Sequence, residues 1–96
     1  MYAVIFKART KVLSDAYFEI ASRMRELALN SYGCSEFISV TEGNQEISIS
    51  YWNSMDDISN WKKNSEHLVA QELGKNSWYE SYHVEIVEIL REYKKS

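Results

Sequence analysis

The chain has 96 residues, of which 45% are hydrophobic and 14% aromatic, and its formal net charge is −3. This length allows one domain with one core, so residues 1–96 are expected to form a single unit. The acidic balance argues against nucleic-acid binding, which requires a basic face. No apolar run reaches the length of a membrane span, and the N-terminal residues lack a signal-peptide layout, so we expect a cytoplasmic protein without membrane association.

The sequence contains a single cysteine, Cys34, which excludes an internal disulfide. Its sequence neighbours include an acidic residue and no histidine, whereas a nucleophilic thiol needs a basic group that lowers its pKa. The two histidines and the distant cysteine lack the spacing of a metal site. No glycine-rich phosphate loop is present. The sequence therefore indicates neither cysteine-based nor metal-based chemistry.

The first expected strand covers Tyr2–Ala8, and both of its alternating residue sets are apolar. A strand of this kind is buried on both faces and lies in the middle of its sheet. A helix is expected to begin after the N-cap Ser14 and to end at Gly33, because glycine readily adopts the left-handed conformation common after helices. The apolar stripe of this helix consists of Tyr17, Ile20, Ala21, Met24, Leu27 and Ala28.

Two short strands follow, at Glu36–Thr41 and Glu46–Trp52, and residues 42–45 between them are typical of a hairpin turn. The second of these strands alternates cleanly, so its register is well specified. One side of it carries Ile47, Ile49 and Tyr51, and the other side carries Ser48, Ser50 and Trp52.

The region from Trp52 to His83 holds all three tryptophans and both histidines, and we expect it to form the main wall of a site. A second helix should begin at Ser54, where Asp57 completes a capping box and complements the helix dipole. The Asn64–Ser65 pair predicts a break and a fresh cap, after which the helix continues and ends at Gly74.

Ser77 and Glu80 form another capping box, which predicts a short helical turn over Trp78–Ser81. The last strand is expected over Tyr82–Tyr93, where a change of phase indicates a bulge near Val87 or burial on both faces. The element order is therefore β-α-β-β-α-β. This order predicts the ferredoxin-like α+β fold, a four-stranded antiparallel sheet with two helices on one face.

The sheet face without helices should still carry apolar side chains, since the first and last strands are apolar in both phases. Such a face would exceed the apolar patch that soluble monomers usually expose, roughly a few hundred Å². A second copy packed sheet to sheet is the economical cover. We therefore expect a homodimer formed through the sheet faces.

Two motifs in the second half of the chain carry a resemblance to a known family. The first is WxxxxxHxxAQ, which runs from Trp61 to Gln71, and the second is GxxxWYxxY, which runs from Gly74 to Tyr82. Together with the strand Glu46–Trp52 and the closing Val-Glu-Ile strand, they make the chain similar to antibiotic biosynthesis monooxygenase (ABM) domains, especially to small bacterial members. The resemblance extends over nearly the whole chain.

This resemblance implies a dimeric α+β barrel in which two ferredoxin-like sheets face each other, with a pocket between helices and sheet in each subunit. It also implies oxygenation of electron-rich aromatic compounds without a cofactor. Polyketide-oxidising members use an Asn and a Trp on the second helix. Trp61 matches that Trp, and Asp57 stands one turn earlier. A haem-degrading branch uses an Asn on the first strand, absent here, and a His nearer to the position of Gln71 than to that of His67.

One face of the second helix carries His67, Ala70, Gln71 and Gly74, as their spacing requires. The two small residues leave room beside two polar groups, which is typical of a pocket wall. His67 is the candidate general base because histidine is the side-chain type that titrates near neutral pH. Alternatively, it bonds a nearby backbone group. We predict His67, Trp61 and Gln71 as catalytic residues.

Further aromatic residues are predicted to bind the substrate. They are Trp52, Trp78, Tyr79 and Tyr82. Large aromatic side chains also dominate protein cores by area alone, so plain packing is the alternative for the tryptophans. The second histidine, His83, lies on the last strand and is expected at a rim or an interface.

Three functions compete at this point. The resemblance and the polar–aromatic pocket wall favour a cofactor-independent monooxygenase or related oxidoreductase that acts on a small aromatic or quinone-like compound. The second candidate is a non-catalytic, stress-related dimer that binds a small molecule in the same pocket. The third is a haem-binding or haem-degrading protein, for which we expect no tight binding of haemin.

Overall fold

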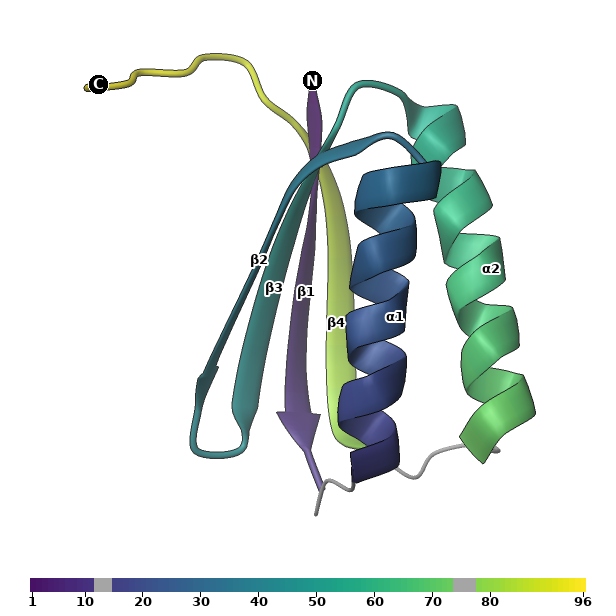
Figure 1. The fold of residues 1–96 in the computed structure, drawn as a ribbon. Coiled ribbons are helices and arrows are strands. Elements are labelled where there is room, and N and C mark those ends of the chain that lie inside the picture. The colour runs from purple at the N-terminus through teal and green to yellow at the C-terminus, as the bar shows by residue number, and fades with distance from the viewer. Residues whose placement is uncertain (12–14, 74–77) are drawn as a thin grey trace.

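The computed structural model describes residues 1–11, 15–73 and 78–96, apart from the side chains of residues 16 and 66–73. Along the chain lie β1 (Tyr2–Thr10), α1 (Asp15–Ser31), β2 (Cys34–Glu42), β3 (Gln45–Trp52), α2 (Met55–Leu73) and β4 (Tyr79–Glu88). These strands form an antiparallel sheet in the order β2-β3-β1-β4, and both helices lie on the same side of it (Figure 1). The predicted ferredoxin-like α+β fold is confirmed. The predicted caps Ser14 and Ser77 and the helix end at Gly74 lie outside the described residues.

The pairing register divides the side chains of the sheet between two faces. Val4 of β1 packs in one buried cluster with Ala28 of α1 and Ile58 of α2. Residues that share the phase of Val4 therefore point toward the helices, and we call this side of the sheet the helix face. The opposite side, to which Ala3 and Ile5 belong, is the open face, because none of the described elements covers it (Figure 1).

The helix face holds two clusters of buried side chains. One cluster joins both helices to the sheet and consists of Val4, Ala28, Cys34, Trp52 and Ile58. The other lies near the first turns of α1 and consists of Tyr17, Ile20 and Trp78. Trp52 is completely buried, and its Nε1–H donates to Ser50 Oγ at 2.8 Å. The polar edge of this large ring is thus satisfied inside the core.

The central position predicted for the first strand is confirmed, since β1 lies between β3 and β4. The strand continues beyond its predicted end to Thr10, whose backbone N–H donates to the Asn44 carbonyl oxygen at 2.8 Å. The predicted hairpin between β2 and β3 is also present. Its turn contains Gly43 with a φ of 59°, a left-handed angle that glycine adopts without steric cost.

The structure corrects the predicted break in the second helix. α2 runs without interruption from Met55 to Leu73. The Ser65 hydroxyl donates to the Trp61 carbonyl oxygen one turn earlier at 2.9 Å, and the Asn64 amide donates to the Tyr32 hydroxyl at 2.9 Å. These two polar side chains therefore bond within the helix and across to the end of α1, and they do not cap a new helix.

The end of α1 and the start of α2 meet at one corner. The predicted cap at Ser54 is confirmed, because the Asp57 backbone N–H donates to Ser54 Oγ at 3.2 Å. Gly33 follows α1 with a φ of 85°, as predicted for the residue that ends the helix. A Cβ atom on Gly33 would lie 2.8 Å from Asp57 Oδ2. The left-handed backbone angle therefore favours glycine here, and a larger residue would also have to displace the Asp57 carboxylate.

The predictions for the last strand are wrong in three respects. β4 begins at Tyr79, which pairs with Thr10, so the predicted helical turn over Trp78–Ser81 does not form. The irregularity in pairing lies beside Thr10 and not near Val87. Regular strand structure ends at Glu88, earlier than predicted. Hydrogen bonding to the central strand β1 therefore decides the conformation of these residues, and the local helix-capping pattern does not.

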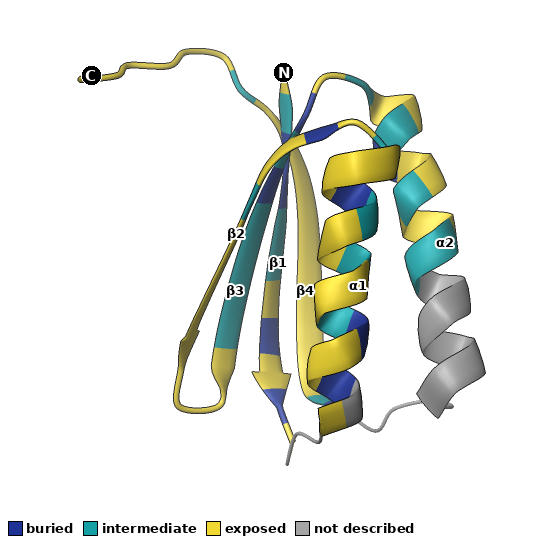
Figure 2. Cartoon of the chain, viewed as in Figure 1, coloured by how far each residue is buried: buried dark blue, intermediate teal, exposed yellow. Residues whose placement is uncertain are grey.

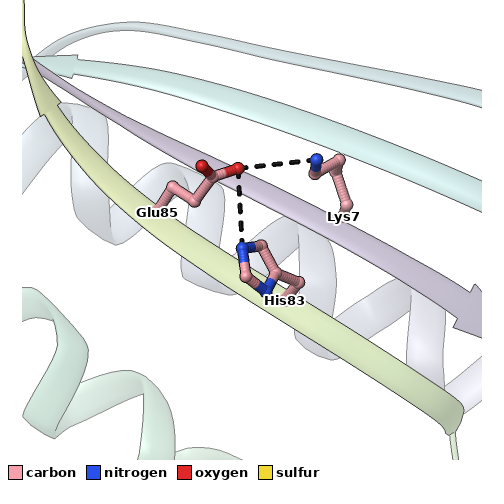
Figure 3. A network of polar contacts seen from close by, with 3 residues as sticks. All are labelled: Lys7, His83 and Glu85. Carbon is pink, nitrogen blue, oxygen red and sulfur yellow. Dashed lines mark ion pairs between the residues drawn. The ribbon is translucent and has the colours of Figure 1, made fainter.

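The open face is apolar over much of its extent. Its apolar side chains come from each strand of the sheet and are Ala3, Ile5, Ile38, Val40, Ile47, Ile49, Tyr51 and Val87. Farther along β1 and β4 the same face carries charges. Lys7 Nζ and His83 Nε2 lie 3.4 Å and 3.6 Å from the same oxygen of Glu85 (Figure 3). The predicted apolar sheet face opposite the helices is therefore present.

Candidate functional site

An apolar strip on β4 is exposed on the helix face. Its members are Tyr82, Val84 and Ile86, and we call them the β4 strip. They pair with β1 residues that share the phase of Val4, so they point to the side where the helices lie. Nevertheless they are 67%, 42% and 43% exposed, and Figure 2 colours nearly all of β4 as exposed. An uncovered apolar surface on the same side as two helices is typical of a ligand-binding wall.

Aromatic side chains adjoin one end of the β4 strip. The Phe6 ring stacks on Tyr82 with ring centroids 6.1 Å apart and an interplanar angle of 25°. The Tyr79 ring centroid lies 5.4 Å from that of Phe6 and 6.1 Å from that of Tyr82. The buried Trp78 ring follows at 6.2 Å from Tyr79. The structure therefore brings together three of the residues predicted to bind substrate.

A partly buried polar pair that the sequence analysis missed lies next to Tyr79. The Tyr17 hydroxyl of α1 donates to the Glu46 carboxylate of β3, and the Tyr17 ring meets the Tyr79 ring edge to face at a centroid distance of 6.1 Å. The apolar period of the first helix assigned Tyr17 to the core, where its ring indeed packs. The sequence feature that could have indicated this pair is Glu46, because it lies on the same side of its strand as Ser48 and Ser50.

Burial holds the protons on both phenols. Burial and the hydrogen bond to Glu46 raise the pKa of Tyr17 well above its ordinary value. Burial likewise raises the pKa of Tyr79 to about 12, although the hydrogen bond with Tyr17 opposes the rise. At neutral pH both hydroxyls are therefore protonated, and each offers one donor together with its lone pairs.

Trp61 and Trp52, two further predicted site residues, belong to the other cluster of the core. The Trp61 Nε1–H donates to the Met24 carbonyl oxygen of α1 at 2.9 Å. Its ring centroid lies 5.4 Å from that of Trp52 and 6.0 Å from that of Phe37. Trp61 is half-buried, whereas Trp52 has no exposed surface and packs against the Trp61 ring. The predicted roles of both tryptophans toward a substrate stay predictions.

His67 and Gln71 both lie in α2, but their side chains are outside the described part of the structure. Their predicted roles as general base and as its polar partner therefore stay predictions. Trp78 adds an observation of its own, because its buried Nε1–H has no hydrogen-bond partner among the described residues. Buried donors are nearly always paired, so an acceptor supplied by a ligand or by another part of the chain would satisfy this group.

Cys34 occupies an environment that disfavours its thiolate. The side chain is buried, and burial raises the pKa of the thiol. Its Sγ–H donates to the Glu36 carbonyl oxygen at 3.2 Å. Among the described residues no three His, Cys, Asp or Glu side chains gather as ligands for a metal ion. Within the same ranges no helix combines the length and the apolar character that crossing a membrane requires.

Two relatives share clear sequence similarity with the chain, although no family model matches it. The uncharacterized protein YqjZ of Bacillus subtilis is 40% identical over 92 residues, a match that covers 95% of this chain and 81% of YqjZ. A Pyricularia oryzae protein named jasmonate monooxygenase ABM is 30% identical over 93 residues. That match covers 93% of this chain but 43% of the fungal protein, so the chain spans less than half of this relative.

The fold is also similar to that of solved structures. A variant of SnoaB, a cofactor-independent oxygenase from Streptomyces nogalater, superimposes with a TM-score of 0.75 over 98% of this chain and 97% of that chain. The two sequences are 7% identical, so this likeness concerns the fold alone.

Proposed function

We propose that the chain, which is similar to YqjZ and to a fungal ABM protein, is an ABM-type protein and a cofactor-independent monooxygenase that acts on a small aromatic or quinone-like compound. The names of two similar proteins support the proposal, since SnoaB is a cofactor-independent oxygenase and the fungal relative is a jasmonate monooxygenase. A shared fold does not specify a reaction, so the argument depends on the geometry of the site.

The β4 strip is the observation that carries the proposal. Three apolar side chains point to the helix side of the sheet and stay exposed there. The rings of Phe6 and Tyr79 adjoin them. Such a wall favours a flat aromatic ligand, because a well-placed ring contact contributes about 0.5–1.5 kcal/mol beyond the burial of apolar area. We place the ligand between the β4 strip and α2.

In this proposal the substrate-binding residues are Trp52, Trp78, Tyr79 and Tyr82, and the catalytic residues are Trp61, His67 and Gln71. Trp52 contributes by supporting the ring of Trp61. His67 takes a proton from the substrate, while Trp61 and Gln71 hold the resulting electron-rich anion for reaction with oxygen. One oxygen atom enters the product, and the other leaves as water with two hydrogen atoms of the substrate. The balance therefore needs no external reductant.

Turnover of 1-naphthol tests the proposal, because its oxidation to the quinone by O₂ follows this balance. Purified protein in buffer with a metal chelator is expected to accelerate oxygen consumption and to place one atom of labelled O₂ in the product. His67→Ala is expected to lower the rate about 100-fold or more, the usual contribution of a general base. Asn60→Ala, at an exposed position of the same helix, serves as the control.

Three outcomes of this experiment separate the alternatives. Tight binding without turnover would favour the non-catalytic binding protein. Unchanged binding and turnover in His67→Ala would show that the role of His67 is wrong. Absence of both binding and turnover for a panel of hydroxylated aromatics would contradict the proposed site on the β4 strip.

We also propose that a second copy of the chain covers the open face. Apolar side chains from each strand of the sheet lie on this face, and Val40 at its edge is 59% exposed. An apolar sheet surface of this kind is typical of sheet-to-sheet packing. A two-fold axis would bring the same face of both copies together, as most homodimers do.

A further inference from the structure

Residues 90–96, which follow β4, form an arm that leaves the body of the subunit. Ile89 is still tied to the sheet, because its backbone N–H donates to the Met1 carbonyl oxygen at 3.0 Å. Beyond it every residue is exposed, and the arm runs away from the sheet on the side opposite the helices (Figure 1). Leu90 and Tyr93 on this arm are 85% and 86% exposed. Burial of two such apolar side chains against another surface would be favourable.

The outer edge of β2 offers a surface of matching chemistry. β2 is the first strand in the sheet order, so it pairs with β3 on one side and with none of the described strands on the other. Such an edge presents unpaired backbone groups that favour the addition of another extended segment. Ile38 and Val40 of β2 point to the open face and are 40% and 59% exposed. Glu36 and Glu42, both exposed, flank this apolar pair in the same phase.

The charges of the arm complement those of the β2 edge. Three of its side chains are basic and one is acidic, namely Arg91, Lys94, Lys95 and Glu92. Lys95 follows Tyr93 by two residues, as Glu42 follows Val40. When Tyr93 packs on Val40, opposite charges therefore come close together, and such pairing helps to specify which surfaces associate.

The other edge of the sheet, β4, fits the arm less well. Its apolar side chains form the β4 strip, which points to the helix face and belongs to the proposed ligand wall. On the open face of β4, the Glu85 carboxylate already has Lys7 and His83 as basic neighbours. A basic arm therefore finds the better complement on β2.

The arm is long enough to reach a second copy that covers the open face. Packed sheets lie about 10 Å apart, and an extended residue spans about 3.3 Å. About three of its seven residues are therefore needed to cross between the sheets, and about four remain to lie along the partner. This crossing places Leu90 between the two sheets and brings Tyr93 to the partner.

We propose that the arm of one copy docks along the outer edge of β2 in the second copy. There Tyr93 packs on the apolar pair of that edge, and the lysines of the arm face the two carboxylates that flank it. The two-fold symmetry of a homodimer forms this contact twice. The inference rests on the proposed cover of the open face, and it is independent of the proposed reaction.

Mixing two charge-reversed variants tests the inference. The arm variant carries Lys94→Glu and Lys95→Glu, and the edge variant carries Glu36→Lys and Glu42→Lys. Each homodimer then opposes like charges in both contacts, whereas the mixed dimer opposes unlike charges in both. The mixed dimer is expected to be at least about tenfold tighter than either homodimer. Native mass spectrometry with one variant labelled with ¹⁵N measures the mixed dimer, and analytical ultracentrifugation measures each dissociation constant.

The matched control reverses two exposed carboxylates of β4 by Glu80→Lys and Glu88→Lys. This control has the same net charge as the edge variant, so it separates the proposed contact from general attraction between oppositely charged chains. The arm variant is expected to prefer the edge variant over the control. Circular dichroism confirms the fold of each variant, and all the substituted residues are exposed.

A wild-type dimer whose arm and edge variants mix without preference overturns the inference and leaves the cover of the open face standing. An arm variant that prefers the control as strongly as the edge variant has the same consequence. Docking of the arm on β2 of its own subunit would also give no preference, because mixing leaves both clashes in place. A monomeric wild-type protein overturns the arm contact and the cover together, and leaves the proposed reaction to its own test.

Discussion

The two faces of the sheet carry different chemistry, and β3 shows the contrast most directly. Under the helices it presents Glu46, Ser48, Ser50 and Trp52, whereas on the open face it presents Ile47, Ile49 and Tyr51. The aliphatic side chains thus lie where the described subunit provides no cover. This distribution is expected if the helix face makes polar and aromatic contacts within the subunit and the open face packs against another copy of the chain.

Two pairs of polar side chains lie on the helix face. Ser50 accepts from the indole N–H of Trp52, and the hydroxyls of Ser39 and Ser48 lie 2.8 Å apart. The bond to Trp52 is buried, and an unpaired polar group there would cost about 1–3 kcal/mol, whereas the serine pair is exposed. On the open face, Lys7, His83 and Glu85 form an exposed charge group. The contrast between the faces therefore leads to different responses to mutation.

The largest effect is expected from two adjacent residues that point to opposite faces. Trp52→Ala removes a completely buried ring and should lower the free energy of unfolding by about 3–5 kcal/mol. Tyr51→Ala removes a half-buried ring from the open face and should cost the isolated subunit about 1 kcal/mol. Urea denaturation at low protein concentration measures both values. Equal costs would remove the distinction between the two faces.

The next effect concerns association. Ile49 pairs with Ile5 and Ile38 in the middle of the open face. Ile49→Glu would place an unpaired carboxylate in the proposed interface, and it is expected to weaken dimerisation at least about 100-fold, or about 2.7 kcal/mol. Light scattering coupled to gel filtration measures the change, with Leu29→Glu on the exposed side of α1 as the control. A wild-type protein that is monomeric at micromolar concentration would contradict the proposed cover.

A smaller effect distinguishes the helix face at alkaline pH. The pKa of Tyr79 is raised from 10.0 to about 12, and that of Tyr17 is raised further. Because the folded-state pKa values are raised, the two phenols contribute full stability below pH 10 and lose it as the pH rises through those values. Ultraviolet titration should show two tyrosines that ionise only above pH 10. Tyr17→Phe should flatten the loss of stability, whereas Tyr93→Phe should not.

The smallest effect is expected at the charge group of the open face. The side chains of Lys7, His83 and Glu85 are each about half exposed or more in the subunit. Ion pairs of this kind contribute less than about 1 kcal/mol, so Glu85→Gln should hardly change the stability of a monomeric Ile49→Glu background. In the wild-type background, where a second copy would cover this group, Glu85→Gln should change the stability of the dimer. If Glu85→Gln changes the stability equally in both backgrounds, this charge group lies outside the interface.

Local sequence signals were sufficient for most of the fold. The cap at Ser54, the glycine after α1 and the hairpin each depend on neighbouring residues alone. The signals failed where a distant partner decided the outcome. Asn64 resembles a helix break, but it bonds Tyr32, which is 32 residues away. Trp78–Ser81 resembles a helical turn, but pairing with β1 makes most of it a strand.

The site was predictable only in part, for the same reason. Tyr79 and Tyr82 were both predicted to bind the substrate, and the structure brings their ring centroids within 6.1 Å of each other. No period in the sequence connects Tyr17 with Glu46, which is 29 residues away and on another element. Their contact depends on how α1 crosses the sheet, and a pattern along one helix contains no information about that crossing.

The corner between Gly33 and Asp57 limits how parts of related proteins can be exchanged. The carboxylate occupies the space that a side chain at position 33 would need. A second helix taken from a relative brings its own residue at position 57. This residue has to fit against the residue at position 33, which is a glycine in this chain. Successful hybrids should therefore transfer the two positions as a unit, even though one precedes β2 and the other follows β3.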